Sequence, residues 1–280
     1  MKARSVRTIV SGHKTVDGAG VNLVRVLGPR TVKDFDPFLM LDAFDSTNPD
    51  DYIRGFPMHP HRGIETVTYL IEGEIEHQDS LGHKGVIHSG DSQWMTAGNG
   101  IMHQEMPAAS PRMLGLQFWI NLAAKDKMVP PKYRNITKDM ITVVEENGAI
   151  VRIISGTYNN AGGAIQPDYV QARFLDVTLE PGTRWEMETL AEDTVFAYIF
   201  QGTAAFESGQ PPLESKQAVL FTQGDILTVF SGMNGVRLVL VSGKPLGEPV
   251  AWGGPIVMNT EAELEKAFSE LESGTFIKHG

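Results

Sequence analysis

The chain has 280 residues, of which 41% are hydrophobic and 21% charged, and its formal net charge is −10. Such an acidic chain repels phosphate backbones, so we expect no direct binding to nucleic acid. The absence of cysteine excludes disulfides, zinc–thiolate sites, iron–sulfur clusters and cysteine nucleophiles. The chain has no apolar stretch of the ~18 residues that a membrane helix needs, and no secretion signal at its start. We therefore expect a cytoplasmic protein without membrane contact, or a nuclear one if its source is eukaryotic.

Two short segments in the first half of the chain each place two metal-ligand side chains two residues apart. They are His59-Pro60-His61 and His103-Gln104-Glu105. Side chains two apart on a β-strand point to the same face. If these segments are neighbouring strands, three imidazoles and one carboxylate converge, a set that suits a divalent transition metal.

Each pair also has a simpler interpretation. His59 and His61 can lie in an exposed turn, although Pro60 is compatible with an edge strand. His103 and Glu105 can form an exposed polar pair, although their apolar neighbours favour burial, and a buried charge needs a partner.

Short apolar runs, rich in β-branched and aromatic residues and separated by glycine and proline, predict strands along most of the chain. Residues 69–73 (YLIEG) are echoed by 198–202 (YIFQG), and the Gly-Asp pair at 90–91 is echoed at 224–225. This repeat predicts two tandem β-domains joined by the polar segment 125–138, although so short a repeat can also arise by chance. Counted from the repeated blocks, the positions of His59, His61 and His103 fall at Glu188, Leu190 and Arg237 in the second copy. Leucine and arginine cannot bind a metal, so we expect chemistry in the first copy only.

One sustained helical pattern follows at residues 259–272. Thr260 can cap this helix and Glu263 can complete a capping box. The apolar residues recur at helical spacing and form one face: Leu264, Ala267, Phe268 and Leu271. The sequence therefore predicts an all-β fold, mainly β with a C-terminal helix.

Other candidate residues lie near the histidine pairs. Their spacing gives His77, His83 and His88 no shared face on a regular element, so we expect them to be exposed. The apolar residues near the pairs are expected in the core, with some of them walling a pocket for a flat aromatic substrate: Trp94, Met95, Phe118 and Trp119.

The segments around both histidine pairs resemble those of a known family. Residues 55–69 (GFPMHPHRGIETVTY) and 90–107 (GDSQWMTAGNGIMHQEMP) are similar to the two cupin motifs in the variant found in pirins, as are residues 116–122 and 254–260. The resemblance runs nearly end to end. It implies two tandem cupin-type β-barrels (a bicupin): an N-terminal barrel at 1–130 with the metal site, a C-terminal barrel at 139–258 without one, and a helix at 259–272.

The resemblance also implies a ligand set. It consists of His59, His61, His103 and Glu105 around one metal, which is iron(II) in most members; nickel, cobalt, manganese, copper and zinc are compatible with the same donors. In ordinary cupins the carboxylate ligand stands where this chain has Glu65. Glu65 is then a hydrogen-bond acceptor for a ligand histidine or a general base, or a solvated strand residue.

The activity implied by the resemblance is that of a quercetin 2,3-dioxygenase, an oxidoreductase. A flavonol such as quercetin loses its 3-hydroxyl proton to Glu105 or Glu65, and dioxygen then cleaves the ring with release of carbon monoxide. The alternative is a non-enzymatic, iron-binding, redox-sensing regulator that binds a protein partner in transcriptional control. Flavonol cleavage can also be incidental to an unknown substrate. We expect a monomer in each case.

Overall fold

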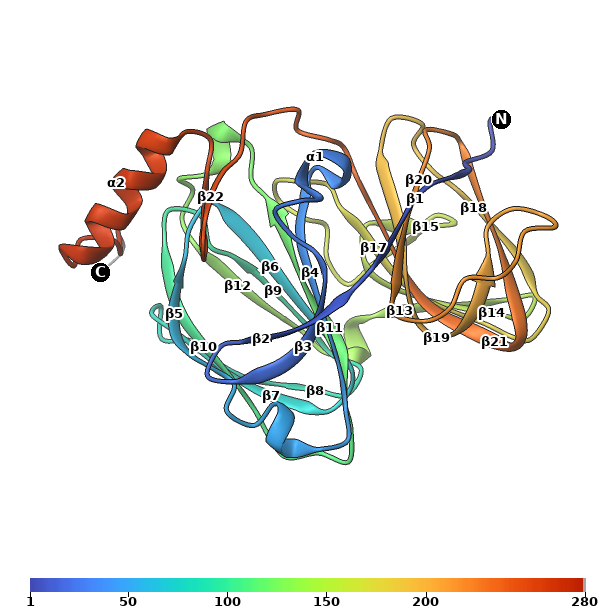
Figure 1. Cartoon of the computed structure of the whole chain (residues 1–280), viewed down its shortest axis with the longest axis horizontal. Coiled ribbons are helices and arrows are strands. Elements are labelled where there is room, and N and C mark those ends of the chain that lie inside the picture. Colours follow the sequence, from blue (N-terminus) through green and yellow to red (C-terminus); the bar gives the residue numbers. More distant parts are fainter. Residues whose placement is uncertain (279–280) are drawn as a thin grey trace. The chain divides into compact units, whose positions relative to one another are not determined.

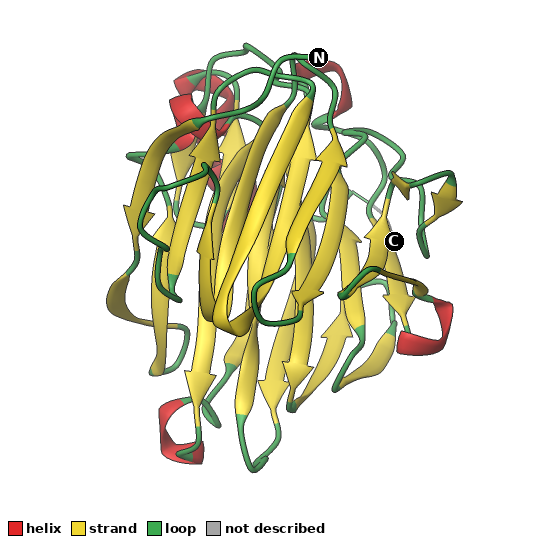
Figure 2. Ribbon diagram, turned by 90° about the vertical axis from the view of Figure 1, so that its right-hand side faces the viewer, coloured by secondary structure: helices red, strands yellow, loops and turns green. Residues whose placement is uncertain are grey.

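The computed structural model describes residues 1–278 and is built mainly of β-strands (Figures 1 and 2). The chain forms two compact units, and neither is continuous in sequence. The first unit comprises residues 14–32, 38–138 and 246 onward, and the second comprises residues 1–13, 33–37 and 139–245. The expected domain limits of 1–130, 139–258 and 259–272 treat each domain as one continuous stretch, and they stay a prediction.

Two antiparallel sheets form the body of the first unit. The larger sheet has seven strands, in the spatial order β12 (Lys132–Ile136), β9 (Ser92–Thr96), β6 (Ile64–Glu72), β11 (Met113–Asn121), β4 (Phe38–Ser46), β3 (Val21–Leu27) and β2 (His13–Asp17). The smaller sheet has four strands, in the order β5 (Phe56–His61), β10 (Ile101–Pro107), β7 (Glu74–Asp79) and β8 (Lys84–His88). Short helical turns connect some of these strands: α1 (Val32–Phe35), η1 (Pro49–Asp51) and η2 (Ala124–Asp126).

Strands β7 and β10 of the smaller sheet follow the period of two that an antiparallel strand with one inward face requires. Along β10, residues 101, 103, 105 and 107 are buried, while 102, 104 and 106 are partly exposed. Strand β5 lies at the edge of its sheet. An edge strand can contain Pro60, which has no N–H to donate to a ladder. The sequence pattern therefore turns both histidine segments toward the interior of the first unit.

The second unit is an eight-stranded antiparallel sheet with a filled interior. Its apolar cluster includes Trp185, Leu227 and Leu238, all nearly or fully buried. The strands, in spatial order, are β1 (Val6–Ser11), β20 (Gln217–Phe221), β19 (Thr194–Ala205), β21 (Ile226–Gly243), β17 (Arg173–Leu179), β14 (Ala149–Ser155) and β13 (Thr142–Glu146), with β18 (Arg184–Glu188) on β21. The short pair β15 (Thr157–Tyr158) and β16 (Ala161–Gly162) and the turn η3 (Lys138–Met140) complete its regular structure.

The repeated sequence blocks occupy matching places in the two units. Tyr69 lies on β6 and Tyr198 on β19, and each strand pairs with a neighbour on both sides. The Gly-Asp pair at 90–91 directly precedes β9, and the pair at 224–225 directly precedes β21. The segment 125–138, expected as a junction, contributes strand β12 to the larger sheet of the first unit, and the second unit resumes directly after it at residue 139.

The last part of the chain returns to the first unit. It consists of β22 (Ala251–Gly253), β23 (Ile256–Met258) and α2 (Glu261–Glu272). The expected C-terminal helix is confirmed, with Thr260 as its N-cap and a complete capping box with Glu263. Leu264 and Ala267 are buried on its apolar face. Within residues 1–278, no helix combines the length and apolar character needed to cross a membrane.

Lys127 fastens this returning segment to the body of the first unit. Its side chain is 1% exposed, and its Nζ donates to the carbonyls of Gly63 (2.9 Å) and Val257 (3.0 Å) and to Asn121 Oδ1 (2.7 Å). An ammonium group has three N–H donors, so the three acceptors match the charged form. Burial lowers the pKa of Lys127 from 10.5 to about 8.

We predict a pH-dependent stability that depends on Lys127. Because the pKa is lowered on folding, the folded protein releases this proton first, and between pH 8 and 10 the unfolded chain binds more protons. The free energy of unfolding therefore rises with pH in this window, by up to about 1.4 kcal/mol per pH unit from this group. In Lys127→Met this rise is absent, and stability at pH 7 falls by about 1–3 kcal/mol because buried acceptors lose their donor. Urea unfolding of the wild type and Lys127→Met at pH 7 to 10 measures the free energy of unfolding as a function of pH. The same pH dependence in the two proteins would contradict a lowered pKa of Lys127 in the folded state.

Candidate metal centre and cavity

The three histidines of the two sequence pairs converge inside the first unit. In the β5–β10 ladder, His59 lies directly opposite His103, and His61 lies opposite Ile101. One ring nitrogen from each histidine lies within 4.8 Å of those of the other two. The ring centroids of His59 and His103 are 4.3 Å apart, and those of His61 and His103 are 5.0 Å apart. The expected convergence follows from the strand register alone.

The tautomers of His59 and His61 are fixed by backbone carbonyls. Nδ1 of His59 donates to the carbonyl of Pro57 at 2.9 Å, and Nδ1 of His61 donates to that of Pro255 at 2.9 Å. A carbonyl only accepts, so each Nδ1 must carry the proton. In the neutral rings both Nε2 atoms then present lone pairs, and these two atoms lie 3.1 Å apart. Two facing lone pairs repel, so a proton or a metal ion between the two nitrogens stabilises the pair.

Burial keeps the inner histidines neutral. Burial, together with the nearby His59, lowers the pKa of His61 to about 3. Burial also holds the pKa of His103 well below its usual range, and neighbouring imidazoles lower it further. Neither ring nitrogen of His103 has a hydrogen-bond partner within residues 1–278. Neutral imidazoles with unused, converging nitrogens are the form in which histidine binds a metal, so these residues fit a divalent transition metal.

The two carboxylates singled out in the sequence are both buried. Glu105 shares the inward face of β10 with His103. It accepts hydrogen bonds from Thr68 Oγ1 (3.0 Å), Gln93 Nε2 (3.3 Å) and Gln117 Nε2 (2.7 Å), which compensate its buried charge. Glu65 lies on β6 and accepts from Thr96 Oγ1 at 2.7 Å, so it is not a solvated strand residue. The cluster of converging ligand atoms comprises the histidines, and Glu105 as a fourth ligand stays a prediction.

The expectation that His77 is exposed is wrong. Its side chain is buried, its ring stacks on Tyr133 at 4.4 Å, and its centroid is 5.5 Å from that of His103. His77 lies between Ile75 and Asp79 on β7, and all three face inward. The alternation with Ile75 is the sequence signal that could have placed it. The side chains of His83 and His88 are 46% and 62% exposed, as expected.

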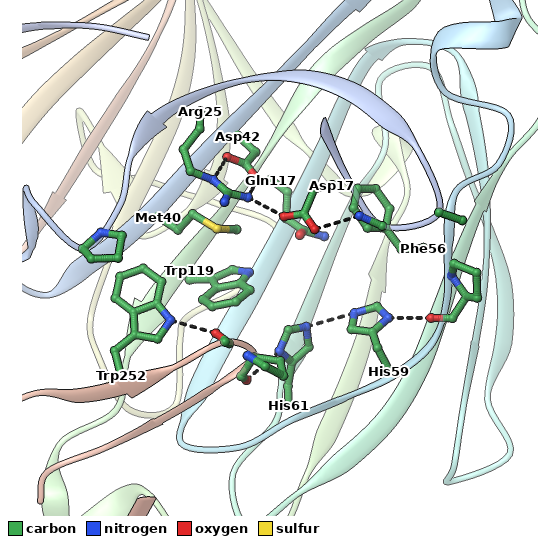
Figure 3. A pocket seen from close by; sticks show the side chains of 16 residues that line it. Asp17, Arg25, Met40, Asp42, Phe56, His59, His61, Gln117, Trp119 and Trp252 are labelled. Carbon is green, nitrogen blue, oxygen red and sulfur yellow. Dashed lines mark hydrogen bonds and ion pairs between the residues drawn. The ribbon is translucent and has the colours of Figure 1, made fainter. Parts of the chain in front are cut away.

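A cavity of about 610 Å³ opens beside the histidines (Figure 3). His59 and His61 lie on one side of it, and Trp119 and Trp252 form an aromatic wall, with ring centroids 5.7 Å apart. Trp119 was expected in the core or in a pocket wall, and it lines this cavity. The other residues of that expectation are core residues: Trp94, Met95 and Phe118.

A charged group lies across the cavity from His59 and His61 (Figure 3). Arg25 on β3 binds Asp42 on β4 through two hydrogen bonds of 2.9 and 2.7 Å, and it binds Asp17 at 2.6 Å. The hydrogen bonds to Asp42 are the main reason that the pKa of Arg25 is raised further, so it stays a cation. No local sequence pattern links β2, β3 and β4, so this group could not be predicted from the sequence.

The two antiparallel β-units, one with a histidine cluster and the other with a filled interior, define the class of two-domain cupin proteins. The pirin family model matches residues 20–120, and the pirin C-terminal cupin domain matches residues 174–277. The chain is 42% identical to a pirin-like protein of Caulobacter vibrioides over 99% of this chain and 100% of that protein. The chain belongs to the pirin family.

Solved structures agree with this assignment. A crystal structure of quercetin 2,3-dioxygenase from Acinetobacter baumannii matches with a TM-score of 0.89 and 30% identity, covering 98% of both chains. A bacterial pirin from Escherichia coli in complex with nickel(II) has the same fold, with a TM-score of 0.65 and 19% identity over 85% of this chain and 98% of that one.

We predict that the histidine cluster binds one divalent metal ion. His103→Ala removes a donor from the cluster and should weaken binding by at least ~100-fold, since loss of an outer hydrogen-bond partner alone costs about 10–100-fold. Titration calorimetry with nickel(II) measures the affinity. His88→Ala is the matched control, because His88 is exposed and contacts Glu74 instead of the cluster. Equal affinities in the two variants would contradict the site.

Proposed function

We propose that this protein is a metal-dependent dioxygenase, with iron(II) as its metal, that cleaves a flavonol such as quercetin in the cavity beside His59 and His61. The observation that carries the proposal is the cluster of His59, His61 and His103, with one ring nitrogen from each within 4.8 Å of the other two. Such a set of converging imidazoles suits a divalent transition metal. The adjoining cavity gives a substrate access to the same point.

The cavity suits a flat, hydroxylated aromatic molecule. Its volume lies within the range of about 300–1,000 Å³ that is typical of small-molecule sites. Trp119 and Trp252 offer apolar faces to an aromatic ring system. On the opposite side, the carboxylates of Asp17 and Asp42 around Arg25 are acceptors for substrate hydroxyl groups, and two carboxylates with one guanidinium disfavour an anionic substituent there.

Each residue of the site has a role in the proposed reaction. His59, His61, His103 and Glu105 hold the metal, which when bound supplies Lewis-acid and one-electron chemistry toward dioxygen. Glu105 takes the proton of the substrate 3-hydroxyl. Its carboxylate is 2.7 Å from Gln117 Nε2, and Gln117 lines the cavity. Glu65, which accepts a hydrogen bond from Thr96 Oγ1, is the second candidate.

The solved relatives support the proposal. The Acinetobacter baumannii structure that covers 98% of both chains is a quercetin 2,3-dioxygenase. The Escherichia coli pirin holds nickel(II), so nickel is an alternative to iron in the same donor set.

The direct test is dioxygen uptake by iron-loaded protein on addition of quercetin. We expect uptake in the wild type, and its loss in His59→Ala, because that variant lacks a metal donor. Bound iron is measured in both samples. An iron-loaded wild type that takes up no dioxygen would contradict the proposed enzyme activity.

A second test separates the two candidate bases. Glu105→Gln should lower kcat by roughly 10²–10⁴-fold per bound metal, the usual contribution of a general base, while the fold is kept because glutamine has nearly the same shape. Glu65→Gln is the comparison and should lower kcat less. Wild-type turnover in Glu105→Gln, with loss in Glu65→Gln, would transfer the role to Glu65.

A further inference from the structure

We propose that residues 251–276, here called the C-terminal segment, support metal binding at the histidine cluster. Docking of this segment holds His61 in its metal-binding tautomer, so metal affinity and docking of the segment are coupled. The inference rests on the metal-binding part of the proposed function and is independent of the reaction.

The segment contacts the ligand strand directly at His61. The carbonyl of Pro255 accepts the Nδ1 proton of His61 at 2.9 Å. Beside it, the backbone N–H of Val257 donates to the carbonyl of Arg62 at 3.1 Å, and Ile256 forms a parallel β-bridge with Arg62. Strand β23 therefore continues the hydrogen-bonding of β5 just past the ligand pair. The proton that Pro255 holds on Nδ1 is the one that leaves Nε2 free to bind a metal.

The backbone approach is too close for any side chain at residue 63. Gly63 has a φ of +78°, a conformation that other residues rarely adopt. A Cβ at this position would lie 1.9 Å from the carbonyl oxygen of Val257. The chain is therefore shaped locally to receive the C-terminal segment immediately after His61.

Arg62 extends the attachment to both ligand strands. This residue is buried, and its guanidinium donates to the carbonyl of Asn99 (2.8 Å), to Glu270 (2.7 Å) and to the carbonyl of Phe276 (2.7 Å). It also lies 4.1 Å above the ring of Phe276. Asn99 precedes β10, the strand of His103, and Arg62 follows β5, the strand of His59 and His61. The Arg62 side chain therefore links the ends of both strands to the C-terminal segment.

Coupling follows from these contacts. Among residues 1–278, the carbonyl of Pro255 is the only one that accepts the Nδ1 proton of His61. When the C-terminal segment undocks, this hydrogen bond is lost, and the His61 ring can change tautomer or rotate. The affinity for metal then falls. By linkage, bound metal stabilises the docked segment to the same extent.

The test compares Arg62→Met with Lys278→Met. Lys278 also binds Glu270, at 2.9 Å, and its other hydrogen bond is to the carbonyl of Thr275 in the C-terminal segment. Lys278→Met therefore removes a cation that binds Glu270 without changing a contact to residues 61–63, which makes it the matched control. Competition with a chelator measures nickel(II) affinity. We expect a ~10–100-fold loss in Arg62→Met, as for other outer partners of metal ligands, and no loss in Lys278→Met. Glu270→Gln keeps Arg62 and should show a smaller loss, which provides a readout if Arg62→Met does not fold.

Amide hydrogen exchange of residues 251–258 gives a second measurement. We expect nickel(II) to slow exchange there in the wild type and in Lys278→Met, but much less in His61→Ala, which lacks the link. Equal nickel affinities in the wild type, Arg62→Met and Glu270→Gln would overturn the coupling alone. A wild type that binds no metal would overturn the proposed metal centre and the coupling with it.

Discussion

The candidate site depends on one close contact, the 3.1 Å approach of His59 Nε2 to His61 Nε2. Carbonyl groups hold a proton of each ring on Nδ1, so both Nε2 atoms are turned toward the same point. Burial lowers the pKa of His61 to about 3, so near neutral pH its Nε2 is an acceptor. A proton on His59 Nε2 or a metal ion bound by both rings stabilises this pair, and the proposed metal centre is the second of these states. The surrounding sheets, which hold the rings in place, provide the rigidity that this geometry requires.

The sequence predicted those parts of the molecule that follow from local periodicity. The period of two predicted that His59 and His61 share one face of a strand and that His103 and Glu105 share one face of another, and the structure pairs these two strands in one sheet. The capping box at Thr260 predicted the terminal helix. The same period of two, applied to β7, would have predicted that His77 faces the interior together with Ile75.

The parts that were not predicted depend on contacts between distant segments. Pro255 and Trp252 lie at the histidine cluster and its cavity because the end of the chain returns to the first unit. No local sequence pattern near residue 250 predicts that return. Arg62 looks like an ordinary surface cation in the sequence, yet it is 2% exposed. The C-terminal segment covers it, and two of its partners, Glu270 and Phe276, lie 208 and 214 residues away in the chain. The polar segment 125–138 reads as a linker, since β12 is a short edge strand with little apolar character.

The second unit shows how the same framework can lack a site. Arg237 on β21, at the position expected to match His103, binds Asp176 at 2.6 Å, and a guanidinium has no acceptor for a metal. Leu190, expected to match His61, is 66% exposed. The interior is filled by apolar side chains such as Leu227 and Leu238. Such packing stabilises the unit and fills its interior with side chains that cannot bind an ion.

The charged wall of the cavity sets a direction for any molecule that enters it. Arg25 is held by two carboxylates and keeps its charge, so Asp17 and Asp42 stay anionic acceptors in fixed positions. Preorganised charges of this kind need no rearrangement when a ligand arrives. In the proposed metal-bound state, a cation at the histidines and net negative charge across from it produce a field along the cavity. The proposed substrate, with an acidic hydroxyl at one end and neutral hydroxyls at the other, then binds in one orientation, with its acidic oxygen at the histidines.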